Sequence, residues 1–423
     1  MKAWKRALAA LLAAGLLAAG LSACNQKPEE PSAIEKVSGF APETTLFTVD
    51  GQPVTAADYC YWLTYNMDYV SSYIYNGEEP VWTDDAADGM TVEEYVRNAA
   101  METAKTYRVV TNKAAEFGCV LSEEEEANLD EQMSSMVTTY GDNEWETALA
   151  AGKVSEDMTE EEQAKWKAEN GQIAYQNALD AQTVGSAELR TIAGIYQLYS
   201  QTLPAKLFAA DGPYPITEET FLDLAEEDGY YSFKHILLST MDESNQPLDD
   251  AGKAEIQTRL QTILDGIRAS ADPAAAFDEA MQQNSEDTGL AYYPDGYFAA
   301  PGQMVPQVET GAKALAIGEI SEIVESDFGY HIILRIPTAN NEENRAAYQN
   351  ALYEELFTQW VEEAQVEETE ELTNLDLSTY FQNLTALRKE LYPEDAADPS
   401  ETGTPETPAP TATPAPTATP AAE

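Results

Sequence analysis

The sequence predicts an α+β fold in which a small antiparallel sheet with its helices is inserted between a mostly helical N-terminal region and a C-terminal helix. Two observations indicate this order. Short runs rich in β-branched and aromatic residues gather in residues 230–338, whereas the segments on both sides carry helical spacing and helix-capping signals. The chain also lacks the regular strand–helix alternation that a parallel sheet requires.

The first 24 residues have the pattern of an export signal. A basic start precedes an Ala/Leu run at residues 7–21, as in secretory signals. The run ends in "LSAC" (21–24), which resembles the bacterial lipobox, a resemblance that implies cleavage before Cys24 and diacylation of its thiol. A plain signal peptide or a short membrane anchor is the alternative. Because two acyl chains give stable anchoring, we expect a lipid anchor on the extracytoplasmic face of a bacterial membrane.

The chain is very acidic. Its 23 basic and 75 acidic side chains give a net charge of −52. This charge argues against nucleic acid and anionic lipid as partners, since both would be repelled. It either keeps a cationic client nearby or simply solvates the surface.

Two cysteines follow Cys24, at Cys60 and Cys119. Outside the cell they could form a disulfide, and in their apolar helical contexts they could equally be buried thiols. No close cluster of His and Cys is present, so the sequence predicts neither a metal site nor a cofactor.

A polar linker at 24–42 leads into a region at 43–229 that we expect to be mostly helical. Three helix starts are indicated by a hydroxyl residue with an acidic residue three positions later: Thr55 with Asp58, Thr91 with Glu94, and Ser122 with Glu125. Gly118 is the expected stop of the second helix. Helical spacing continues from about 160 to 209.

Residues 230–338 change in character. "FKHILLS" is typical of a strand, and the following helix places Ile256, Leu260, Ile263 and Ile267 on one face. A second helix begins near Pro273. "VPQVETGAKAL" predicts a third helix closed by Gly318, and "EIVES" and "YHIILRI" predict two further strands.

The C-terminal part begins with a helical segment, 339–392, whose large residues recur every four positions from Tyr348 to Ala364. Such a stripe needs a partner, and we expect the N-terminal helical region to supply it. Residues 393–423 repeat Pro-Ala-Pro-Thr-Ala-Thr. We expect a disordered, extended tail that serves either as a spacer through the cell wall or as inert chain.

A family resemblance covers about 105 residues. Five short motifs occur in order: "KHILL" (234–238), "NSED" (284–287), "GYF" with "GQMVP" (296–306), "GEIS" (318–321) and "FGYHIILRI" (328–336). Together they resemble a parvulin-type peptidyl-prolyl cis-trans isomerase. The whole layout resembles the PrsA-type foldase lipoproteins of Gram-positive bacteria and, more loosely, the periplasmic SurA chaperone.

The resemblance implies a site. The family's two facing histidines, on adjacent strands under a proline-binding pocket, would be His235 and His331. Asp287 matches the Cys/Asp position of the hydrogen-bond network and Ser326 the hydroxyl position. The residues expected to bind substrate, with Met304 lining the pocket and Phe298 behind it, are Met304, Phe298, Val308 and Phe328. The plainer alternatives are structural histidines and an Asp287 that only forms a turn.

The chain also departs from the family pattern. "YYPDG" (292–296) replaces the usual Gly-Gly-x-Leu-Gly, so that Pro294 or Asp295 stands at the pocket leucine, and Val308 replaces an aromatic residue. We expect a narrower, wetter pocket and weaker turnover.

Three functional hypotheses follow. The first is a membrane-tethered foldase that isomerises X-Pro bonds in unfolded or newly exported proteins. The second is a non-catalytic holdase that binds unfolded clients and carries a degenerate parvulin domain. A third, a solute-binding lipoprotein, would need two α/β lobes. The apolar clefts of the helical region leave a homodimer open.

Overall fold

The structure of the protein is a computed structural model that describes residues 31–87, 89–242 and 246–393. The described residues form two compact units, which we call unit 1 (31–200 and 360–393) and unit 2 (201–359). Helix makes up 60% of the structure, and the predicted α+β class with an inserted small antiparallel sheet is confirmed. The predicted signal with Cys24 and the tail from residue 394 lie outside the described residues.

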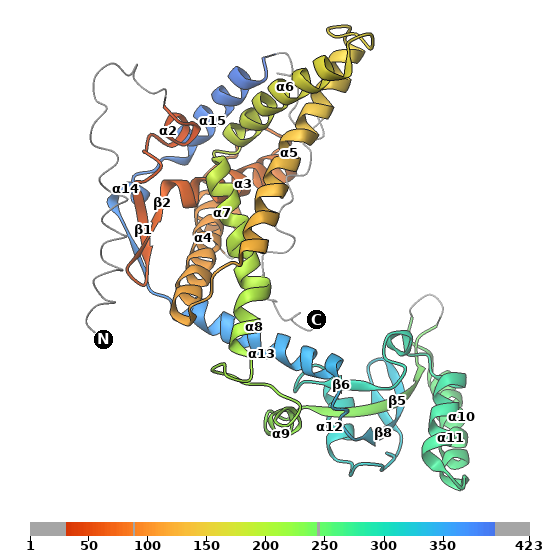
Figure 1. Cartoon of the computed structure of the whole chain (residues 1–423). Helices are drawn as coiled ribbons and strands as arrows, with labels where there is room; N and C mark the ends of the chain where they lie inside the picture. Colours follow the sequence, from red (N-terminus) through yellow and green to blue (C-terminus); the bar gives the residue numbers. More distant parts are fainter. Residues whose placement is uncertain (1–30, 88, 243–245, 394–423) are drawn as a thin grey trace, which may run out of the picture. The chain divides into compact units, whose positions relative to one another are not determined.

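Unit 1 is mostly helical (Figure 1). Its elements are α2 (Ala33–Ser38), β1 (Thr45–Val49), β2 (Gln52–Thr55), α3 (Ala56–Ile74), β3 (Asp85–Ala87), β4 (Met90–Thr91), α4 (Val92–Phe117), α5 (Glu123–Ala150), α6 (Glu160–Ala181), α7 (Ser186–Gln197), β9 (Val366–Glu368), α14 (Glu370–Thr373) and α15 (Leu377–Leu391). In the described part of unit 1, β2, β1 and β9 form one antiparallel sheet in that order. This sheet joins an N-terminal segment to a segment more than 300 residues later in the chain.

The predicted helix boundaries of this unit are confirmed. Thr55, Thr91 and Ser122 each form a capping box with the acidic residue three positions later. These reciprocal hydrogen bonds satisfy backbone N–H groups that have no partner inside the helix. Gly118 ends α4 in the left-handed conformation, at φ 67°, which glycine adopts without steric cost.

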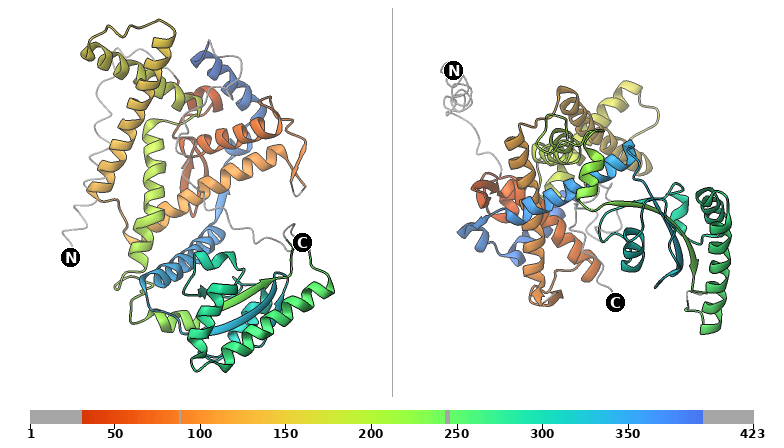
Figure 2. Two further views of the ribbon diagram at one scale, coloured as in Figure 1. Left: turned by 90° about the vertical axis from the view of Figure 1, so that its right-hand side faces the viewer. Right: turned by 90° about the horizontal axis from the view of Figure 1, so that it is seen from below.

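Helices α5 and α6 form a long hairpin that packs closely because glycines lie at the contact (Figure 2). A Cβ added to Gly141 on α5 would lie 2.4 Å from the carbonyl oxygen of Lys167 on α6. A Cβ added to Gly171 would lie 2.7 Å from the Cα of Gly141. Any larger residue at these positions would force the helices apart, since real Cβ contacts are longer.

Both cysteines of unit 1 are buried thiols. Burial raises the pKa of the Cys60 thiol to about 12, although side-chain hydrogen bonds from Tyr380 and Ser38 act in the opposite direction. Cys60 is therefore inert at neutral pH, as expected for a structural cysteine.

Unit 2 contains the predicted sheet. Its elements are α8 (Leu203–Leu207), α9 (Phe221–Glu227), β5 (Tyr231–Ser239), α10 (Asp250–Ala269), α11 (Pro273–Asn284), the 3₁₀ turn η2 (Thr288–Ala291), β6 (Tyr297–Ala299), α12 (Pro306–Lys313), β7 (Val324–Ser326) and β8 (Gly329–Ile336). In the described part of this unit the strands follow the order β6-β5-β8-β7, and every neighbouring pair is antiparallel. The chain passes between the units within the π-helix η1 (Leu198–Thr202) and within α13 (Glu342–Glu363).

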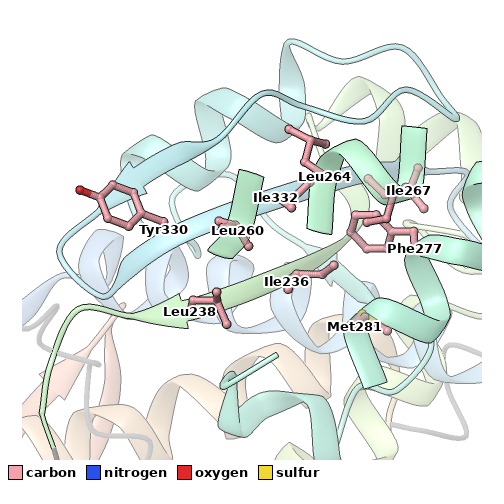
Figure 3. Packing of buried hydrophobic residues seen from close by; sticks show 10 residues of the cluster. Ile236, Leu238, Leu260, Leu264, Ile267, Phe277, Met281, Tyr330 and Ile332 are labelled. Carbon is pink, nitrogen blue, oxygen red and sulfur yellow. The ribbon is translucent and has the colours of Figure 1, made fainter. Parts of the chain in front are cut away.

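One face of this sheet is closed by α10 and α11 (Figure 3). Ile236 and Leu238 of β5 alternate with residues of the other face and pack against Leu260 and Leu264 of α10 and Phe277 of α11. Burying each such side chain stabilises the unit by about 1.5–3 kcal/mol. The predicted apolar face of α10 is confirmed, and helix α12 covers the opposite face.

The predicted closure of α12 at Gly318 is wrong. The helix ends at Lys313, with Ala314 as its C-cap. Gly318 instead donates its N–H to the carbonyl of Arg335 at 2.8 Å. It therefore lies beside the end of β8 and cannot cap the helix.

Helix α13 carries the predicted stripe across the division between the units. Tyr348 packs against Phe221 and Tyr230 within unit 2. Trp360 packs against Phe117 within unit 1. Among the described residues, no helix is both long enough and apolar enough to span a membrane.

Candidate active site on the α12 face of the sheet

The two histidines of the chain meet on the sheet face that α12 covers. In the antiparallel register His331 lies opposite Leu237, one diagonal step from His235, so that both side chains leave the same face. Their Nδ1 atoms are 3.1 Å apart and the rings are nearly parallel, at an interplanar angle of 12°. His331 is 2% exposed. Residues 96 positions apart therefore form one hydrogen-bonded pair.

The pair is extended at both ends. Ser326, at the end of β7, places its Oγ 2.6 Å from His331 Nε2. Asp287, which follows α11, places Oδ2 2.9 Å from His235 Nε2. The polar chain thus runs Ser326–His331–His235–Asp287, and all four residues that the resemblance singled out for the network lie in hydrogen-bond contact.

Asp287 is held by two further groups. Its Oδ1 accepts the N–H of Gly289 at 3.0 Å, which makes Asp287 the N-cap of η2. Its Oδ2 also accepts the hydroxyl of Tyr297 at 2.6 Å. The turn role and the network role of Asp287 are therefore compatible, because they use different carboxylate oxygens.

The electrostatics of the chain follow from these contacts. Burial opposes the charge on Asp287, but hydrogen bonds from His235 and Tyr297, attraction to His235 and the Gly289 N–H together lower its pKa to about 2. Burial and repulsion from His235 lower the pKa of His331 to about 4 against the opposing field of Asp287. At neutral pH, Asp287 is ionised and His331 is neutral.

These charge states assign the protons when both imidazoles are neutral. An ionised carboxylate only accepts, so His235 donates from Nε2 to Asp287. Its Nδ1 then accepts the Nδ1–H of His331, whose Nε2 accepts the Ser326 hydroxyl. Each member of the polar chain therefore has a hydrogen-bond partner, and every donor points toward Asp287. A buried polar network requires such complete pairing.

An apolar cluster continues the same face next to the histidines. Phe233 and Ile333, two residues before His235 and two after His331, are fully buried in it. Met304 and Val308 pack into this cluster, and Val308 is 2% exposed. The structure therefore brings two of the four expected binding residues together beside the polar chain.

Of the other two expected binding residues, Phe298 lies on the opposite face of the sheet. Phe298 pairs with Ser232 across the strands and so leaves the opposite face, where it stacks on Tyr230 with ring centroids 5.0 Å apart. It does not lie behind Met304. Phe328, in the turn before β8, is 59% exposed, and its backbone N–H donates to Ser326 Oγ at 3.2 Å.

Tyr297 is a site residue that was not predicted from the sequence. Its ring stacks on Phe233 at 5.5 Å and meets His235 edge-on at 5.5 Å. Gly296, at φ 105°, immediately precedes β6 and lies so close to β5 that an added Cβ would be 2.8 Å from the carbonyl oxygen of Phe233. The alternation of side chains along a strand could have indicated this role. Once β6 is paired with β5, it puts Tyr297 and Ala299 on the same face as the histidines.

The sheet and the polar chain lie in a segment that is similar to a known family of proline isomerases. Residues 235–337 match the family model described as Rotamase, PPIC-type PPIASE domain. The prediction of a parvulin-type domain in this region is confirmed.

Relatives extend the match beyond this domain. The chain is 30% identical over 200 residues to the foldase protein PrsA of Oceanobacillus iheyensis, covering 46% of this chain and 58% of that protein. It is 32% identical over 142 residues to the chaperone SurA of Chromohalobacter salexigens, covering 33% of this chain and 30% of that one. The matches thus span less than two thirds of these relatives.

A solved structure gives a weaker likeness. The peptidylprolyl isomerase (PrsA) from Bacillus anthracis aligns over 69% of this chain and 96% of its own, at 17% identity and a TM-score of 0.26.

Proposed function

We propose that the protein is a peptidyl-prolyl cis-trans isomerase that assists the folding of other proteins. The observation that carries this proposal is the chain Ser326–His331–His235–Asp287 lying beside the cluster of Met304 and Val308. The match of residues 235–337 to the PPIC-type family supports it.

The arrangement suits a reaction without a nucleophile. Rotation about an X-Pro amide has a barrier of about 18–20 kcal/mol, because conjugation is lost when the bond twists. Catalysis then needs an apolar surface for the prolyl ring and polar groups that favour the twisted amide. In our proposal the partly buried Met304 supplies this surface, and the buried Val308 supports it from the core. His235 and His331, oriented by Asp287 and Ser326, set the polarity of its floor.

We also propose the setting. Residues 43–229 and 339–392 would form the client-binding part, and residues 230–338 the isomerase. Lipidation of Cys24 would hold the protein on the extracytoplasmic face of the membrane, where unfolded exported proteins are the clients. The names of the relatives, a foldase and a chaperone, support this assignment.

The test is a protease-coupled prolyl-peptide assay on the chain without its first 24 residues. His235→Ala and Asp287→Ala should each lower kcat/KM at least tenfold, because each change leaves a neighbour in the network without a partner. Asp265→Ala, an exposed carboxylate on α10, is the matched control and should have the wild-type rate. Equal rates for wild type and both site variants would exclude the catalytic role.

A non-catalytic holdase is the second candidate. The exposed tyrosines of α3 favour it: Tyr65, Tyr69 and Tyr73 are 47, 48 and 78% exposed at a spacing of four residues, so they form one apolar stripe in unit 1. Suppression of client aggregation that persists in His235→Ala would support this function. The same stripe would serve a homodimer, which sedimentation at two concentrations would detect.

A further inference from the structure

Unit 1 contains a cleft that the proposed isomerase does not use. It has a volume of about 720 Å³ and lies among α3, α5, α6 and α7. This size falls in the range of pockets that take ligands. Aromatic and apolar side chains form much of its wall: Tyr61, Met136, Tyr140, Tyr175, Leu179 and Val184.

The polar part of the wall consists largely of groups able to donate hydrogen bonds. The side-chain amides of Asn128, Gln132 and Gln182 line the cleft and make no hydrogen bond within the described residues. Tyr140 and Tyr175 form a ring pair at 5.8 Å. A ligand rich in carbonyl acceptors and flat apolar rings would match this wall. Proline-rich chains have that chemistry, because each proline keeps its carbonyl and lacks an N–H.

The chain leaves its last described helix beside this cleft. Arg388, in the last turn of α15, donates from Nε to the carbonyl of Ala181 at 2.9 Å, next to the cleft residue Gln182. One turn later, burial and the nearby Tyr140 raise the pKa of Tyr392 to about 12. The described part of the chain therefore ends, at Pro393, near the edge of the cleft.

The charges of these 30 residues select one part of them. The acidic residues lie in the first part and at the last position: Glu394, Asp395, Asp398, Glu401, Glu406 and Glu423. Residues 407–422 carry no charge. In a protein with a net charge of −52, and with Glu131 in the wall of the cleft, this is the part that can approach without repulsion.

The repeat in this neutral segment fits a polyproline II helix. That helix has three residues per turn, so a six-residue repeat occupies two whole turns. Alanine would then fill one face at every position from Ala409 to Ala421, and proline would alternate with threonine along another from Pro408 to Pro420. Residues 394–406 can span up to about 43 Å when extended, about the length of the 28-residue α5.

We propose that residues 407–422 bind in the cleft as a polyproline II segment, so that the chain is its own ligand and competes there with proline-rich segments of other proteins. This inference is independent of the proposed isomerase activity. Tethering by a short linker gives an effective concentration in the millimolar range. A segment that binds with a Kd of about 100 μM as a free peptide would therefore occupy the cleft in most molecules.

The test uses a fluorescein-labelled peptide of residues 404–422 and fluorescence anisotropy. The chain ending at residue 393 should bind this peptide about tenfold more tightly than the full chain, in which the tail competes. A full chain with the five prolines of residues 407–422 changed to alanine should bind it as tightly as the truncated one. This second variant leaves the folded units untouched. A peptide with the same alanine changes should not bind.

The site is located by Tyr140→Ala in the truncated chain, which should lose most of the affinity. Tyr73→Ala is the matched control, because Tyr73 is exposed on α3 and does not line the cleft. The urea midpoint from tryptophan fluorescence shows whether each variant is folded.

Three results would overturn the proposal. If the truncated chain does not bind the peptide, the cleft is not a proline-rich site. If full and truncated chains bind equally, the cleft takes external segments and not the tail. If sedimentation of the full chain shows a dimer that truncation removes, the tail binds a second copy instead of its own chain.

Discussion

The two units contain buried polar networks of opposite design. In unit 1, the hydroxyls of Thr64, Thr183 and Tyr380 lie within 2.7–3.1 Å of one another, and Arg388 forms a two-fold pair with Asp68 at 2.7 Å. In unit 2, the network is the chain from Ser326 to Asp287 with two imidazoles in the middle.

The difference concerns the kind of group at the centre of each network. The unit 1 network joins α3, the end of α6 and α15, and it consists of three hydroxyls and one guanidinium–carboxylate pair. The unit 2 network contains the only two histidines of the chain and lies beside a partly open apolar cluster. A network of fixed charge stabilises a fold, whereas one with titratable groups can also serve chemistry.

The two units can be followed separately. Five of the six tryptophans lie in unit 1, and the sixth is Trp4 outside the described residues. Tryptophan fluorescence therefore reports the unfolding of unit 1. Isomerase activity and hydrogen exchange of β5 and β8 report on unit 2.

The largest effect is expected for Arg388→Ala. The change leaves Asp68 without its partner and frees the carbonyl of Ala181. We expect a loss of about 3 kcal/mol in the free energy of unfolding, as for other partly buried pairs that lose one member. Urea unfolding by tryptophan fluorescence measures it, with exposed Lys389→Ala on the same helix as the control. If Arg388→Ala has the wild-type urea midpoint but reduced isomerase activity, the unit 1 network would serve activity and not stability.

The next effect is the loss of unit 2 stability in acid. Between pH 6.5 and about 4 the unfolded chain binds a proton at His331 that the folded chain does not, so stability falls as the pH falls. The expected loss is about 3 kcal/mol. Asp287 adds a further loss from pH 3.8 toward 2, because its folded pKa is also lowered.

Hydrogen exchange of β5 and β8 at several pH values measures this loss. His331→Gln should remove the dependence between pH 6.5 and 4 and keep the one below it. A variant that retains the full slope would show that another group is responsible.

A smaller effect is expected for Tyr380→Phe. The change removes a buried hydroxyl that contacts Thr64, Thr183 and the carbonyl of Cys60. The two threonines still bond to each other, so we expect a loss of about 1 kcal/mol in unit 1. Isomerase activity should be unchanged. A fall in activity would mean that the networks of the two units are coupled.

The sequence predicted local features well and tertiary pairing less completely. The capping boxes at Thr55, Thr91 and Ser122 depend on residues three positions apart, so they could be read directly. The end of α12 could not, because Gly318 is held by Arg335, which is distant in sequence. A local glycine signal does not reveal such a contact.

Dependence on distant contacts also explains which residues of the candidate site lie where we expected them. The four network residues came from a family resemblance, and they lie in contact. Phe298 was expected behind Met304, but the register of β6 against β5 sends its side chain to the other face. A shift of one residue in register would have reversed this. Register depends on long-range pairing, which no short segment specifies.

Tyr297→Phe gives the most direct comparison of the two networks, because it removes the same group from the unit 2 network as Tyr380→Phe removes from the unit 1 network. It removes the hydroxyl that donates to Asp287 at 2.6 Å and keeps the ring that stacks on Phe233. We expect kcat/KM to fall about fivefold, which corresponds to about 1 kcal/mol, and unit 2 to remain folded. Tyr293→Phe, whose ring contacts Tyr297 at 4.9 Å, is the control.

The pH profile separates orientation of Asp287 from simple packing. Without the Tyr297 hydroxyl the carboxylate loses a donor, so its pKa rises and activity declines at a higher pH on the acid side than in the wild type. A variant that loses activity equally at every pH would show that the hydroxyl only shapes the pocket. If Tyr297→Phe changes stability and Tyr380→Phe changes activity, titratable groups are not what distinguishes the two networks.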